Sequence, residues 1–125
     1  MFQFFSMIPL FLALGLWTTP GAAPYVARIE ARQQGEQLTI VAHCLNQTAE
    51  PVALRYELRS ERQGQSGTSR NTQSGNCRAL PGQEVALGRS SFNVTAQDSY
   101  RIRLVLLTAE GRVVAADSLV HPSQR

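Results

Sequence analysis

The stretch Val52-Ala53-Leu54-Arg55-Tyr56-Glu57-Leu58 decides the fold class, because apolar and polar residues alternate along it. This period of two is typical of a β-strand that buries one face. The residues predicted to point inward are Val52, Leu54, Tyr56 and Leu58, and those predicted to point outward are Ala53, Arg55, Glu57 and Arg59. The sequence therefore indicates a strand with a charged outer face.

A polar tract follows this strand over residues 59–75 and reads RSERQGQSGTSRNTQSG. It carries Ser, Thr, Gln and Arg at alternating positions, interrupted by glycines. Such a tract is either a flexible loop or a flat polar strand at a sheet edge. The sequence alone leaves both alternatives open, with a weak strand expected around residues 68–73.

Period-two alternation recurs along the rest of the chain, and no convincing helix periodicity appears after the N-terminal segment. Short strands separated by turn signals predict an all-β sandwich of about seven antiparallel strands. The expected strands cover residues 26–32, 37–45, 52–60, 68–73, 84–94, 98–108 and 112–120, with a candidate bulge at Gly88. The predicted core consists of Leu38, Ile40, Leu54, Tyr56, Leu58, Ile102, Leu104 and Leu106.

The N-terminal segment is apolar from Met1 to Trp17 and is followed by small residues up to Ala23. This pattern predicts a secretory signal peptide over residues 1–23, although no Lys or Arg precedes the apolar run. A retained membrane anchor is the alternative, but the run is short for a span of roughly 20 residues. We therefore expect export to the periplasm and one domain over residues 24–125.

The charge of the chain is modest, with a formal net value of +3, and all twelve basic residues are Arg. A nucleic-acid-binding protein of this size would show a denser basic patch with aromatic residues beside it. The two cysteines, Cys44 and Cys77, form an even pair in a chain expected to be exported, which favours a disulfide. A redox-active pair is the alternative, but the spacing is not Cys-x-x-Cys.

The chain resembles the small periplasmic inhibitors of curli assembly, the CsgC/CsgH family, and more closely its CsgH branch. The similarity runs from about Gln37 to about Leu119. Its most specific parts are the Gly-Gln-Ser-Gly-Thr-Ser tract and the turn at Leu80-Pro81-Gly82-Gln83. The resemblance implies an immunoglobulin-like β-sandwich and a chaperone-like role that prevents premature amyloid polymerisation of a curli-type subunit. It also implies a transient partner of that kind.

One family feature is missing from this chain. The enterobacterial branch has a Cys-x-Cys pair in the strand that corresponds to Val52–Tyr56, where this chain has no cysteine. A redox role of that branch therefore does not carry over.

A basic sheet face is the candidate binding site. In an immunoglobulin-like order the third and sixth strands are neighbours, so their outward residues share one surface. The predicted client-binding residues are Arg55, Arg59, Arg101 and Arg103, which surround Glu57. Arginine keeps its charge and donates several hydrogen bonds at once, which suits carboxylate or amide acceptors. An ordinary solvated sheet face is the alternative.

No catalytic constellation appears, and neither an enzyme nor a cofactor is expected. The two histidines, His43 and His121, and two cysteines expected to be bridged make a weak metal-ligand set. A monomer without nucleic-acid partners is expected. A structural or adhesive immunoglobulin-like module of a surface fibre is the competing function.

Overall fold

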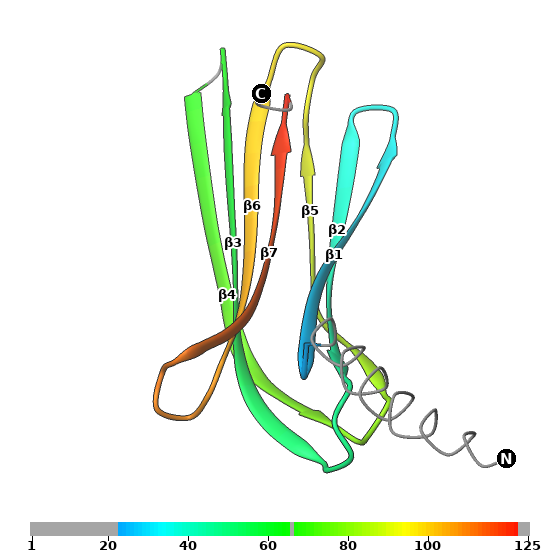
Figure 1. Cartoon of the computed structure of the whole chain (residues 1–125). Helices are drawn as coiled ribbons and strands as arrows, with labels where there is room; N and C mark the ends of the chain where they lie inside the picture. The colour runs from blue at the N-terminus through cyan, green and yellow to red at the C-terminus, as the bar shows by residue number, and fades with distance from the viewer. Residues whose placement is uncertain (1–22, 66, 123–125) are drawn as a thin grey trace, which may run out of the picture.

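Seven antiparallel strands form two sheets in the computed structural model, which describes residues 23–65 and 67–122 (Figure 1). The strands are β1 (Tyr25–Gln34), β2 (Gln37–Asn46), β3 (Val52–Gly64), β4 (Gly67–Ala79), β5 (Glu84–Asn93), β6 (Ser99–Leu107) and β7 (Val113–His121). This confirms the predicted all-β sandwich. The predicted signal peptide lies almost entirely outside the described residues.

The sheets have the strand orders β1-β2-β5 and β4-β3-β6-β7. This is an immunoglobulin-like arrangement in which the fourth strand lies beside the third instead of joining the first sheet. β3 and β6 are neighbours, as predicted, and pair antiparallel from Arg55 opposite Leu107 to Gln63 opposite Ser99. Residues that oppose each other in this register point to the same face of the sheet.

The core lies between the sheets and is built from the inward residues of the alternating strands. Of the eight residues predicted to be buried, seven are at most 5% exposed, and Ile40, Ile102, Leu104 and Leu106 are fully enclosed. Tyr56 is only half-buried, because it lies at the boundary between β4 and β5 and not in the centre of the core. That part of the core prediction was wrong.

The polar tract is a strand and not a loop. β3 continues to Gly64, beyond the predicted end at residue 60, and pairs along its whole length with β4. The resulting hairpin has thirteen residues in each strand. The alternative of a polar edge strand is therefore the correct one, and its predicted extent, residues 68–73, was too short.

Other local predictions are borne out with small shifts. Gly82 has a φ of +75°, and the N–H of Gln83 donates to the carbonyl of Leu80 at 3.0 Å, as in the predicted turn. The pairing of β2 with β5 shifts next to Gly88, so the candidate bulge is present. His121 belongs to β7 and stacks on Tyr100, whereas the last predicted strand ended at residue 120.

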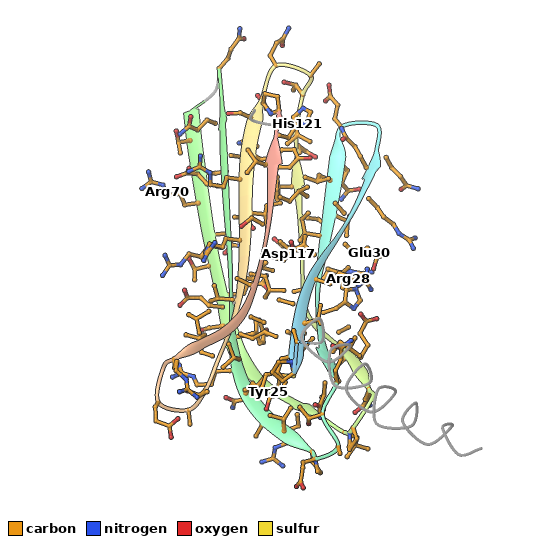
Figure 2. The ribbon with its side chains drawn as sticks, viewed as in Figure 1. Tyr25, Arg28, Glu30, Arg70, Asp117 and His121 are labelled. Carbon is orange, nitrogen blue, oxygen red and sulfur yellow. The ribbon has the colours of Figure 1, made fainter. Side chains whose placement is uncertain are left out.

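Side-chain hydrogen bonds bridge the two open sides of the sandwich at a few points. At the β4–β5 side, the hydroxyl of Tyr56 donates to the carbonyl of Leu87 at 3.3 Å, and Gln73 Nε2 donates to the carbonyl of Arg89 at 3.0 Å. At the β1–β7 side, Asp117 accepts the backbone N–H of Ile29 (Figure 2). These bonds occupy backbone groups that an edge strand would otherwise leave free.

Candidate functional site

The outer face of the four-stranded sheet carries half of the chain's twelve arginines. Strand pairing places the following charged residues on it: Arg55, Glu57, Arg59, Glu61, Arg70, Arg78, Arg101 and Arg103. Six arginines and two glutamates give the described residues of this face a net charge of +4. The outer face of the other sheet carries three arginines and two glutamates, so the positive charge is concentrated on one side.

Register brings three of the four predicted site residues together. Arg59 lies directly opposite Arg103 across the β3–β6 pair, and Arg101 is opposite Glu61. Glu61 in turn is opposite Arg70 on β4, so the charged residues form a row across three strands. Arg70 projects from β4 away from the three-stranded sheet (Figure 2).

The carboxylates of this face each pair with one guanidinium. Glu57 contacts Arg59 at 2.8 Å, and Glu61 contacts Arg70 at 2.8 Å. Both pairs are largely exposed, which limits each to about 1 kcal/mol or less. Arg103 donates to the hydroxyl of Ser118 at 3.4 Å, and neither Arg101 nor Arg103 forms an ion pair within the described residues. These two guanidinium groups retain most of their hydrogen-bond donors for a ligand.

A shallow groove of about 460 Å³ runs over this row. Arg59, Arg70, Arg101 and Arg103 line it, together with Glu61 and Thr72. Arg55 shares the same sheet face but lies opposite Leu107, outside the groove lining. The structure thus joins three predicted residues and leaves the fourth at the margin.

Sequence reasoning missed Arg70 and Glu61. The signal was present, since both continue the outward alternation of their strands once the hairpin register is known. Because residues 59–75 were expected to form either a loop or a weak strand, the pairing of β3 with β4 was not predicted. The position of Arg70 opposite Glu61 therefore could not be predicted either.

Cys44 and Cys77 come from different sheets and lie in the core as free thiols. Burial, together with the hydrogen bond to the Cys77 thiol, raises the pKa of Cys44 to about 12. The thiol is therefore held in its unreactive, protonated form. The two sulfur atoms are neighbours, and a disulfide between them stays a prediction.

No cluster of three or more metal-ligating side chains occurs in the described residues. His43 contacts Glu30 at 2.9 Å on the other sheet, and its hydrogen bond is the main reason that the pKa of Glu30 is lowered. Within residues 23–65 and 67–122, no helical segment has the length and hydrophobicity that a membrane crossing requires.

A family model described as "Thin aggregative fimbriae synthesis protein" matches residues 26–116, which is most of the chain. The chain belongs to this family. The resemblance noted in the sequence is thereby confirmed, and membership supports a role in the synthesis of thin aggregative fimbriae. The description names the synthesis of fimbriae and mentions no enzymatic reaction.

Two solved structures share the fold along nearly their whole length. The E. coli curli protein CsgC has a TM-score of 0.64 and 21% identity, and the alignment covers 79% of this chain and 99% of that one. CsgH of R. palustris has a TM-score of 0.57 and 23% identity, with coverages of 74% and 89%. At these identities the comparison shows the fold.

The same fold occurs within larger proteins. A β-glucuronidase of Bacteroides uniformis matches 78% of this chain with a TM-score of 0.57 and 15% identity, but the match covers 14% of the enzyme. No curated protein sequence matches the chain. The functional proposal below therefore starts from membership of the thin aggregative fimbriae family.

Proposed function

We propose that this protein is a periplasmic, chaperone-like inhibitor that prevents premature amyloid polymerisation of a curli-type fibre subunit. Family membership supports a curli-associated role. The observation that carries the inhibitory role is the row of arginines across β4, β3 and β6, of which Arg101 and Arg103 form no ion pair among the described residues.

A positively charged face attracts a client with acidic or amide-rich segments and raises the rate of encounter. Guanidinium groups in a shallow, exposed groove bind weakly, because each contact is screened and competes with water. Weak binding suits a monomeric inhibitor that engages early assemblies transiently and needs no ATP. Export of the mature domain, residues 24–125, would place it in the periplasm, through which the fibre subunit is secreted.

Side-chain bonds at the edges of β1 and β5 support the same role. An inhibitor that meets β-rich assemblies must not become part of the fibre. Bonds from Asp117, Tyr56 and Gln73 occupy one backbone group on β1 and two on β5 that would otherwise be free to pair with another chain.

Fibre formation followed by thioflavin fluorescence, with a purified curli-type subunit, tests the proposal. The parent protein is expected to delay polymerisation well below an equimolar ratio and to do so less as salt rises. The variant Arg59→Glu/Arg101→Glu/Arg103→Glu reverses three charges of the groove without touching a buried side chain. It should fold, as shown by circular dichroism, and inhibit much less.

A second triple variant provides the matched control. Arg32, Arg89 and Arg112 are exposed and lie outside the groove, so their replacement by Glu changes the net charge by the same amount. This control should inhibit like the parent. A folded groove variant that inhibits as well as the control would falsify the arginine site. Incorporation of the parent protein into the fibre would instead indicate a structural or adhesive module.

A further inference from the structure

The inward side chains change from apolar to polar toward the tip of the β3–β4 hairpin. On β3, Leu58 is buried in the core, but the next inward positions are Ser60 and Arg62. On β4, the inward positions nearest the tip are Ser69 and Asn71, and both are exposed. The inward positions of the hairpin are therefore polar near its tip, although Phe92 and Tyr100 of the neighbouring strands pack edge to face at this end of the sandwich.

A groove runs between β4 and β5 at this end. It consists of two adjoining hollows of about 200 Å³ and 520 Å³, which share Arg62, Ser69 and Phe92 in their linings. Asn71 on β4 faces Ser90 on β5, with Nδ2 and Oγ 3.4 Å apart. The groove therefore lies between the facing edges of two strands from different sheets.

Both strand edges lack a partner strand along the groove. Among the described residues, β4 pairs only with β3, and β5 pairs only with β2. The side-chain bonds that close this side of the sandwich come from Tyr56 and Gln73, which lie farther from the tip. The backbone of β4 is thus open to a further strand over about residues 67–72.

The protective features that usually guard an edge strand are absent here. β4 contains no Pro or Lys, and its two arginines, Arg70 and Arg78, point to the outer face of the sheet. Four charged side chains line the groove, and they neutralise one another in two ion pairs: Arg62 with Asp98 at 3.3 Å, and Arg70 with Glu61 at 2.8 Å. The remaining lining offers hydroxyl, amide and aromatic groups, so the groove favours a polar but uncharged occupant.

We propose that this groove binds an extended, uncharged peptide rich in amide and hydroxyl side chains, which adds a strand to the edge of β4. Backbone hydrogen bonds supply the affinity in this mode of recognition, and the polar pockets supply the selectivity. The site shares Glu61 and Arg70 with the lining of the arginine groove, but Arg59, Arg101 and Arg103 line the arginine groove alone. The proposal does not rest on the inhibitory role, and either proposal can fail while the other stands.

A capped peptide of about eight residues, composed of Ser, Thr, Gln and Gly, is a suitable probe. In a titration followed by NMR, shift changes are expected in the amides of residues 67–73 and 90–93. Exchange of the β4 amides with solvent should slow on binding, and added salt should have little effect. The same peptide N-methylated at alternate residues keeps its side chains but loses backbone donors, and it should not bind.

A pair of variants at neighbouring positions tests the location. Ser69→Tyr fills the groove and should weaken binding about tenfold or more. Thr68→Tyr places the same ring on the opposite face of β4 and should leave the affinity within about twofold. The titration with the two peptides uses the parent protein, so it tests whether the groove binds a peptide strand even when Ser69→Tyr does not fold.

Three results would overturn the proposal. One is equal binding of the N-methylated peptide, and another is a set of shift changes centred on Arg101 and Arg103. The third is a concentration-dependent shift of the β4 amides without any peptide, which would assign this edge to a second copy of the chain.

Discussion

The carboxylate Oδ2 of Asp117 accepts a 2.8 Å hydrogen bond from the backbone N–H of Ile29. Asp117 belongs to β7 and Ile29 to β1, which are edge strands of opposite sheets. Oδ1 of the same carboxylate accepts the N–H of Ser118 at 2.9 Å. This side chain therefore links the two sheets at the β1–β7 side and occupies a backbone donor of the β1 edge.

Replacement of Asp117 tests this contact. Asp117→Ala leaves the N–H of Ile29 without its partner and should lower the free energy of unfolding by about 1–3 kcal/mol. Asp117→Asn keeps an acceptor oxygen in place and should cost less. Urea unfolding of the three proteins measures both differences, and equal losses in the two variants would contradict the role of the acceptor.

Truncation of the core should be costly at Leu104, which is fully buried on β6. Leu104→Ala is expected to lower the free energy of unfolding by about 2–5 kcal/mol, through lost burial and the cavity it leaves. The side chain of Val113 is 52% exposed, so Val113→Ala should change the free energy of unfolding by no more than about 0.5 kcal/mol. Comparable losses at both positions would be inconsistent with the described core.

We predict that Cys44 and Cys77 form a disulfide in the exported protein. A bridge closing a loop of roughly 33 residues should stabilise the fold by roughly 3.5–4 kcal/mol in the chain-entropy model. Alkylation in denaturant without reductant should then add no mass, whereas alkylation after reduction should add two groups. Two adducts without reduction would rule the bridge out.

The reduced protein should show a distinct dependence of stability on pH. The pKa of Cys44 rises from its ordinary value of 9.0 to about 12 in the fold, chiefly through burial. Between these values the unfolded chain binds fewer protons than the folded one, so stability falls as pH rises. The Cys44→Ala variant and the bridged protein should lack this loss, as unfolding titrations from pH 8 upward can show.

Asp98 should produce the opposite dependence at low pH. Its pKa is lowered from the ordinary value of 3.8, mainly because its carboxylate accepts the backbone N–H of Thr95, with help from Arg62. The stability that the Asp98 carboxylate contributes is fully present above its ordinary pKa of 3.8. This stability is lost as the pH falls through the lowered pKa of Asp98 in the folded protein. The advantage of the parent over Asp98→Asn should therefore shrink below about pH 4. A constant difference from pH 6 to pH 2 would contradict this.

The fold was largely predictable because burial alternates cleanly along most strands. Leu38 and Ile40, like Ile102 and Leu104, are separated by one outward residue and mark their strands without further information. β4 could not be delimited in this way, because its inward positions near the tip are as polar as its outward ones. Its strand state depends on pairing with β3, which is a non-local property.

The candidate site was predictable only in part, for the same reason. Arg59, Arg101 and Arg103 follow from the alternation of β3 and β6 and from the expected neighbourhood of these strands. Arg70 required the register of the hairpin, in which Gly64 lies opposite Gly67 and Glu61 opposite Arg70. The position of Tyr56 also escaped prediction, because its ring belongs to a boundary between sheets and not to either sheet alone.

The position of Tyr56 limits how this sequence can change over evolution. A Cβ atom on Gly75 would lie 2.9 Å from the ring, and one on Gly88 would lie 3.2 Å from the hydroxyl. The three positions should therefore covary among homologues: a larger residue at either glycine position should accompany a smaller one in place of Tyr56. Lineages that lost the tyrosine would be free to lose Gly75, whereas a side chain at position 88 would also require Gln73 to move, because its Oε1 would lie 2.7 Å from the added Cβ.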